Sequence, residues 1–213
     1  INEDFSNLSH MNLTGNKIDS INLTKNVHLE YFYSNFNEFK SINTDHNPKL
    51  KIISIDNNIP NWEHDCFDGV VNVEDTIVKL DFSKNLKLES ISIPTTGIIN
   101  LDLSNNTKLI WINAANNRLS TLDFSNNTSI ETIMLGDNNL SYINIDGISS
   151  LKIFTAPGNQ LSNIDLSSNL SRPLSVSRSS CRSSLYFIIC PSRASMLRPP
   201  FFNLTISPSI NLV

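Results

Sequence analysis

Four adjacent side chains of types that bind metal ions stand at Glu63, His64, Asp65 and Cys66. A zinc or similar site needs such ligands to converge on one ion from several directions. Adjacent residues of an extended loop point to opposite sides, and no second cluster in the sequence supplies the remaining ligands. We therefore predict no metal site and no cofactor.

The four histidines, His10, His28, His46 and His64, recur every 18 residues. Stacking them on one face would require the period of 21 residues that organises the rest of the chain, so they scatter around it instead. General acid–base or nucleophilic catalysis needs a nucleophile, a base and a charge-stabilising group that converge. The sequence assembles no such set, and we predict a protein without catalytic residues.

A row of carboxyl and amide side chains alternates with apolar residues, at Asn22, Asn43, Asp81, Asp102, Asp123, Asn144 and Asp165. Because successive residues of a strand face opposite sides, this row is expected to face solvent. A calcium-binding ladder would use such oxygen atoms, but the row lacks the Gly-rich turns of calcium-binding β-rolls. We favour a solubilising row over a calcium site.

Apolar residues recur at intervals of 21 along most of the chain. One series is Leu8, Leu29, Leu50, Leu88, Leu109, Ile130 and Leu151. Segment 109–127 shows both halves of a unit, LxxLxLxxNxL followed by LxxLDLxxN. Apolar residues that alternate at period 2 predict short strands with one face inward. Each unit therefore holds two half-coils, which bury their inner faces only by stacking on neighbouring units.

Each half-coil ends in an Asn that recurs with the same period, with two departures at Thr96 and Ile148. The first ladder is Asn16, Asn37, Asn58, Thr96, Asn117, Asn138 and Asn159, and the second is Asn26, Asn47, Asn85, Asn106, Asn127, Ile148 and Asn169. An inward Asn bonds backbone groups that a tight coil leaves unpaired, whereas burying it unpaired would cost about 1–3 kcal/mol. Both ladders are therefore expected to be structural.

These motifs resemble those of bacterial leucine-rich-repeat proteins of the 21-residue type, whose units combine LxxLxLxxN with LxxLDLxxN. The LDL form occurs at 101–103, and the resemblance covers about residues 8–169. It implies an all-β-dominated leucine-rich-repeat solenoid with short parallel strands and little or no helix. It also implies a secreted or cell-surface protein that mediates adhesion or protein contacts.

The repeat is interrupted once and then stops. Seventeen extra residues, 60–76, follow the unit that contains Asn58, and we expect this apolar insertion to pack on the solenoid flank. Residues 170–213 hold 11 Ser, five Arg and five Pro, with no Lys, Asp or Glu. Two interpretations stay open: a frame-shifted or disordered tail, or a cap in which 185–190 covers the last coil. The predicted domains are 1–169 and 170–213.

Charge is divided unevenly along the chain. Residues 1–169 have a formal charge of −9, and residues 170–213 one of +5. Phosphate binding depends on concentrated cationic side chains, so an acidic body without Lys or Arg clusters in its sequence predicts no nucleic-acid partner. No apolar run approaches the roughly 20 residues that cross a bilayer, and we predict no transmembrane segment.

The outward strand positions are the candidate binding residues. They vary from unit to unit while inward positions repeat, as in a scaffold whose face is specialised. We predict a protein or glycan ligand that contacts chiefly Tyr31, Tyr33, Trp111 and Met134, since such side chains bury large areas at low entropic cost. Two alternatives remain: a substrate-targeting domain of a larger enzyme or effector, and a structural spacer whose exposed residues are an ordinary surface.

Overall fold

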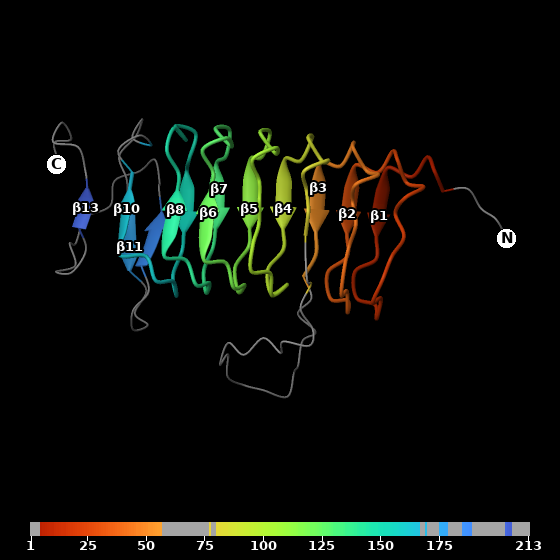
Figure 1. Ribbon diagram of the computed structural model, residues 1–213, viewed down its shortest axis with the longest axis horizontal. Helices are drawn as coiled ribbons and strands as arrows, with labels where there is room; N and C mark the ends of the chain where they lie inside the picture. The colour runs from red at the N-terminus through yellow and green to blue at the C-terminus, as the bar shows by residue number, and fades with distance from the viewer. Residues whose placement is uncertain are drawn as a thin grey trace.

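The computed structural model describes residues 5–56, 77, 80–166 and 169, together with the backbone of three short strands between residues 175 and 205. The chain winds into a stack of flattened coils, whose short strands follow one another along a solenoid axis (Figure 1). Among these residues there is no α-helix, and hence none long and apolar enough to span a bilayer. The predicted parallel-strand solenoid with little helix is confirmed.

One wall of the solenoid is a sheet built from the first half of each coil. Its parallel strands are β1 (His10–Asn12), β2 (Tyr31–Tyr33), β3 (Ile52–Ser54), β4 (Ser90–Ser92), β5 (Trp111–Asn113), β7 (Thr132–Met134) and β9 (Ile153–Thr155). Tyr31 pairs with His10 on one side and with Ile52 on the other. Ile52 pairs with Ser90, so β3 and β4 are neighbours despite the extra residues between them.

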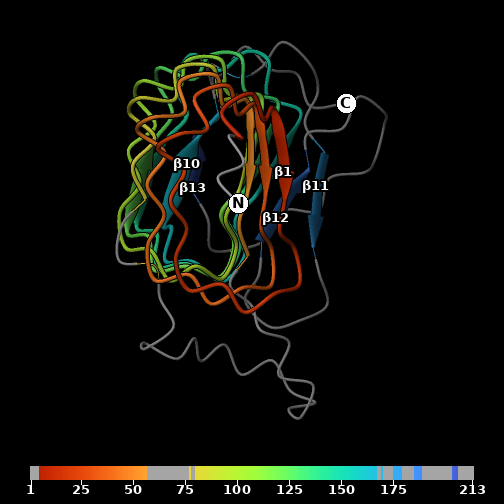
Figure 2. The same ribbon diagram turned by 90° about the vertical axis from the view of Figure 1, so that its right-hand side faces the viewer.

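The second half of the coils forms the opposite wall. There, β6 (Thr121–Asp123) pairs parallel with β8 (Tyr142–Asn144). Farther along, β10 (Asn163–Asp165) pairs parallel with β13 (Asn203–Thr205). Figure 2 is viewed along the solenoid axis and shows β10 and β13 across the coil from β1 and β2. The two walls therefore face each other over a common interior.

Three strands come from the segment after residue 170. Besides β13, these are β12 (Leu185–Ile188), which pairs antiparallel with β9, and β11 (Ser175–Arg178), which pairs antiparallel with β12. In the first wall, the change from parallel to antiparallel pairing ends the regular series of strands at β9. The cap interpretation and the domain boundary at residue 169 stay predictions. The predicted insertion at 60–76 lies outside the described residues.

Inward side chains of both walls form one continuous apolar core. Its largest members are Phe32, Phe39, Phe82, Phe124 and Phe154, each fully buried. The residue that opens each coil is buried from Leu29 to Leu151, whereas Leu8 in the first described coil is only partly buried. Burying one such large side chain contributes about 1.5–3 kcal/mol, so the stack is held together mainly by contacts between adjacent coils.

The first ladder bonds each coil to the one before it through both ends of an amide. Asn37 donates from Nδ2 to the Leu13 carbonyl (2.9 Å), and its Oδ1 accepts the N–H of Ile18 (3.1 Å). The same two contacts are made by Asn117, Asn138 and Asn159. Asn16 is exposed and bonds only within its own turn, and Asn58 lies outside the described residues.

In the second ladder the amino groups of the amides make the contacts between coils, and Asn85 is the exception that also uses its Oδ1. Asn106 donates from Nδ2 to the carbonyls of Phe82 (3.1 Å) and Asn85 (3.0 Å) in the preceding coil. The same pair of bonds is made by Asn47, Asn85, Asn127 and Asn169, whereas Asn26 bonds the Phe5 carbonyl. Four of these amides have a buried Oδ1 with no partner among the described residues: Asn47, Asn106, Asn127 and Asn169.

At one position of the second ladder, a side chain of the preceding coil supplies the Oδ1 atom with a partner. The Oδ1 of Asn85 accepts a hydrogen bond from Thr44 Oγ1 at 2.7 Å. Thr44 is buried at a position that other coils fill with apolar residues such as Leu23, Phe82 and Leu103. A buried hydroxyl is tolerated here because it has a partner, in agreement with the rule that buried polar groups are hydrogen-bonded.

A left-handed backbone position recurs in the turn after the first strand. Gly15 and Gly158 occupy it with φ of 76° and 64°. The other residues there are Phe36, Thr95, Asn116 and Asp137, with φ between 53° and 56°. For residues with a bulky or branched side chain, such as Phe36 and Thr95, this conformation costs about 1–2 kcal/mol. Stacking of the coils in register imposes the turn geometry even where the local sequence disfavours it.

Candidate functional site

The candidate site is the outward surface of the first wall, which we call the strand face. Its first row is His10, Tyr31, Ile52, Ser90, Trp111, Thr132 and Ile153, and its second row is Asn12, Tyr33, Ser54, Ser92, Asn113, Met134 and Thr155. Residues of one row pair strand by strand, so neighbours lie about 4.8 Å apart. The face is thus a continuous grid of side chains that differ from coil to coil.

The N-terminal end of the strand face carries a compact polar and aromatic cluster. The rings of His10 and Tyr31 stack with centroids 4.2 Å apart and an interplanar angle of 18°. Lys51 Nζ lies 5.9 Å from the centroid of the Tyr31 ring and 2.7 Å from Glu30 Oε2. This hydrogen bond lowers the pKa of Glu30 and raises the pKa of Lys51. At neutral pH the cluster therefore presents a fixed pair of opposite charges beside an aromatic stack.

The four predicted binding residues fall into separate places on this face. Tyr31 and Tyr33 both lie on β2, where Tyr33 pairs with Asn12 and Ser54. Trp111 is three strands away on β5, and Met134 lies on β7 beside Asn113. All four predicted residues are partly exposed. They therefore span a broad surface and do not form a single pocket.

Two features of the strand face were not predicted, namely one buried position in its outward row and one ion pair beside it. Thr132 is buried, with 9% of its surface exposed, because this small side chain lies between the larger Trp111 and Ile153 on the neighbouring strands. The Glu30–Lys51 pair was not predicted because it stands just before the strands. Aligning the repeats would have found it, since the two residues occupy the same position in consecutive coils.

On the opposite wall, the row of Asp and Asn residues closes turns. Asp102 Oδ1 accepts the N–H of Ser104 at 2.9 Å, and Asp123 Oδ1 accepts that of Ser125 at 2.8 Å. The same bond to the N–H two residues on is made by Asn22, Asn43, Asp81 and Asn144. The row therefore initiates Asx turns, a local role that neither the solubilising nor the calcium interpretation includes.

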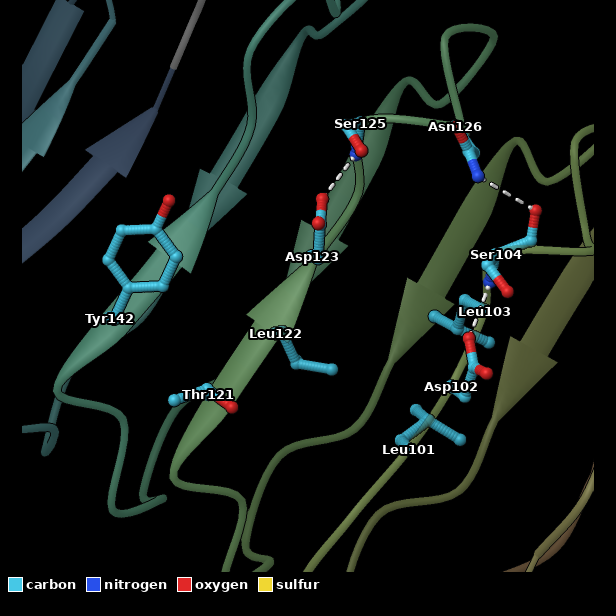
Figure 3. Close-up of a pocket in the computed structure, with 10 residues that line it drawn as sticks. All are labelled: Leu101, Asp102, Leu103, Ser104, Thr121, Leu122, Asp123, Ser125, Asn126 and Tyr142. Carbon is cyan, nitrogen blue, oxygen red and sulfur yellow. Dashed lines mark hydrogen bonds between the residues drawn. The ribbon is translucent and has the colours of Figure 1, made fainter.

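A shallow hollow of about 400 Å³ lies on this wall between the turns of adjacent coils. Figure 3 shows Asp102 and Asp123 in it, each bonded to the Ser two residues on, with Asn126 reaching the Ser104 carbonyl. Tyr142 on β8 stands at its border and is 58% exposed. In the described part of the chain, no group of three or more His, Cys, Asp or Glu residues is arranged to hold a metal ion.

The Asx turn at Asp102 predicts a specific pH dependence. Hydrogen bonds from the backbone and hydroxyl of Ser104 hold the pKa of Asp102 below its ordinary value of 3.8. A carboxyl whose pKa is lowered by folding stabilises the protein above its unfolded pKa, and this contribution is lost as pH falls through the folded pKa. For such an exposed group the effect is at most about 1 kcal/mol.

We therefore expect the difference in free energy of unfolding between the native protein and Asp102→Asn to shrink as the pH falls from about 5 to 3. The amide keeps an acceptor for Ser104 but does not titrate. Urea unfolding across this range measures the difference. A difference in unfolding free energy that stays constant across this pH range would show that the turn does not favour the ionised carboxyl.

Comparison with known proteins identifies the fold. No protein-family model and no curated protein matches the sequence. A leucine-rich-repeat protein of Leptospira interrogans has a similar structure, with a TM-score of 0.62 and 18% identity over 74% of this chain and 39% of its own. An internalin of Listeria monocytogenes gives a TM-score of 0.61 and 20% identity over 78% of this chain and 46% of its own.

A third similar structure is the complex of LRIM1 with APL1C, with a TM-score of 0.51 and 15% identity over 76% of this chain and 35% of that chain. The present chain spans less than half the length of each of these three chains. At these identities the likeness concerns the fold. The fold of this protein is that of a leucine-rich-repeat solenoid.

Proposed function

We propose that this protein is a non-catalytic protein-binding module that recognises its partner on the strand face. The observation that carries this proposal is the contrast between the two sides of one sheet. Inward positions repeat Leu, Ile and Phe from coil to coil, while the paired outward positions hold His, Tyr, Ile, Ser, Trp and Thr. A rigid, variable surface of this kind supplies the preorganisation that specific binding needs.

The side chains on the strand face suit a protein partner. Tyr31 and Trp111 offer large aromatic surfaces, and such residues dominate the energetics of interfaces. The stacked His10 holds Tyr31 in place, which reduces the entropy lost on binding. The fixed charges of Glu30 and Lys51 beside it would orient the partner.

The resemblance to known proteins supports the same class of function. One similar structure is itself a complex between two proteins, LRIM1 and APL1C. The sequence also resembles bacterial repeat proteins that are secreted or displayed at the cell surface. We propose that this protein acts there in adhesion or host contact, with a protein as its main ligand.

The double variant Tyr31→Ala, Trp111→Ala is expected to bind its partner at least about tenfold more weakly, since loss of a central aromatic contact typically costs 2 kcal/mol or more. Retention of biotinylated cell-surface proteins on the immobilised native and variant proteins measures this, with a glycan array in parallel. Tyr142→Ala is the matched control, because it removes an exposed aromatic ring from the opposite wall.

All proteins in this comparison must melt at the same temperature, which shows that the coils remain folded. Equal retention by the native protein and the double variant would reject the strand face. A loss confined to Tyr142→Ala would move the binding site to the opposite wall.

A further inference from the structure

We propose that a second surface, apart from the strand face, binds a linear anionic polysaccharide. It lies on the turns that lead from the second half of one coil to the first strand of the next. Its residues are Lys25, Val27 and His28, then His46, Pro48 and Lys49, then Lys84, Leu86 and Lys87, and finally Thr107 and Lys108. We call this surface the basic track.

Two consecutive tight turns make these residues project from the coil. In the third coil, the N–H of Asn85 bonds the Phe82 carbonyl (3.0 Å) and the N–H of Leu88 bonds the Asn85 carbonyl (3.1 Å). The same two bonds recur in the first, second and fourth coils, at Asn26 and Leu29, Asn47 and Leu50, and Asn106 and Leu109. The central residues of such turns point away from the chain reversal, and every residue of the track is one of them.

The second ladder stacks these turns in register. Asn47 donates to the Asn26 carbonyl at 2.9 Å, Asn85 to that of Asn47 at 3.0 Å, and Asn106 to that of Asn85 at 3.0 Å. Equivalent residues of adjacent turns therefore lie about 4.8 Å apart. Lys49 Nζ comes within 2.7 Å of His28 Nδ1, so side chains of neighbouring coils meet along the track.

The track combines cationic and apolar side chains in parallel files. Val27 (40% exposed), Pro48 and Leu86 (56% exposed) form a central file. Five Lys residues flank it on two sides: Lys25 and Lys84 on one, and Lys49, Lys87 and Lys108 on the other. Apart from Lys49, none of these makes a hydrogen bond or salt bridge with a described residue, so four ammonium groups are available to an anion.

This arrangement matches the chemistry of an acidic polysaccharide. The C–H faces of sugar rings can pack on the central apolar file, and carboxylate or sulfate groups on either side of the polymer can reach the ammonium groups. Charge-assisted hydrogen bonds of this kind are the stronger ones in proteins. Each bound anion also releases a counterion from the polymer, which makes binding sensitive to salt.

The borders of the track determine which polyanion fits. Asp45 and Asp81 lie on one side of it, and Glu30 and Glu89 lie on the other. An anionic membrane or a nucleic-acid duplex would extend over both borders and meet these carboxylates, whereas a single polymer chain meets only the track. Single-stranded nucleic acid gains much of its binding from aromatic stacking, and the track contains no Tyr, Phe or Trp.

The test uses the triple variant Lys84→Gln, Lys87→Gln, Lys108→Gln and the matched control Lys17→Gln, Lys40→Gln, Lys152→Gln, which removes the same charge away from the track. Affinity for dextran sulfate and for polygalacturonate is measured against salt, with uncharged dextran as reference. We expect the triple variant to bind at least about tenfold more weakly at low salt, with a log–log salt slope smaller by about 2, while the control changes little.

A second variant separates the apolar file from general charge attraction. Leu86→Ser is expected to weaken polysaccharide binding without changing the salt slope, because it removes no charge. No binding of either polymer by the native protein, equal losses in the triple variant and its control, or an unchanged affinity of Leu86→Ser would each overturn the proposal. Tighter binding to single-stranded DNA or to anionic vesicles would also overturn it.

Discussion

Replacing Asn106 by alanine is expected to lower the free energy of unfolding by about 2–4 kcal/mol. Its amino group donates to the carbonyls of Phe82 and Asn85, and its own carbonyl accepts from Leu109 and from Asn127. Loss of the side chain removes one of the two hydrogen bonds that each of these carbonyls accepts, at about 0.5–1.5 kcal/mol per bond, and the cavity left by the buried side chain adds to this loss. The Oδ1 atom has no partner among the described residues, so the loss comes from the donors.

Asn105→Ala is the matched control for this prediction. Asn105 is the neighbouring residue, is exposed and takes no part in the ladder, so its replacement should change stability by less than about 0.5 kcal/mol. Urea unfolding followed by circular dichroism measures both variants. Similar midpoints for the two variants would show that the ladder does not stabilise the stack.

The variant Phe124→Ala is expected to destabilise the protein by about 3–5 kcal/mol. Phe124 is fully buried in the core that both walls share, and the coils on either side cannot collapse into the space it leaves without breaking their own register. Because each coil contacts only its neighbours, we expect the loss of stability to cause local opening of the coils around Phe124 before global unfolding.

Ile99→Ala provides the comparison, since Ile99 is 57% exposed and its removal creates no cavity. Thermal melting gives the overall loss, and hydrogen exchange shows where the coils open. Relative to the native protein, we expect exchange to increase more in β6 and β8, near Phe124, than in β1 and β2. A uniform increase along the whole stack would contradict the model of coils that depend on their neighbours.

Much of the fold follows from the sequence because the inward positions obey strict geometric rules. Residues such as Leu29, Leu109 and Asn127 recur at one interval, and a solenoid places residues at that interval in equivalent environments. The left-handed position after the first strand was not foreseen, since Gly15, Phe36 and Asn116 share only a backbone angle. Periodicity of residue type reveals packing but not backbone conformation.

The two ladders also differ in a way that residue type conceals. Asn37 and Asn138 use both the donor and the acceptor of the amide, whereas Asn47 and Asn127 use only the donor between coils. The difference depends on which backbone groups each turn leaves unpaired, and this is a property of the stacked structure.

The outward surfaces were harder to predict because their chemistry arises between coils. Lys49 and Lys87 are far apart in the sequence and appear as isolated charges there, yet the coils bring them to adjacent positions. Scattered Lys and Arg residues in the sequence of a repeat protein can therefore still form a charge cluster on its surface. Comparing equivalent positions of successive units, such as 28, 49, 87 and 108, would have shown the basic track.

Binding of a partner protein to the strand face can be detected by crosslinking. A photo-crosslinking amino acid is placed at Ser92, in the middle of that face, or at Thr121 on the opposite wall. After incubation with cell-surface proteins and irradiation, we predict specific adducts from position 92 that the Tyr31→Ala, Trp111→Ala background abolishes. Adducts only from position 121, or adducts from position 92 that persist in that background, would contradict binding to the strand face.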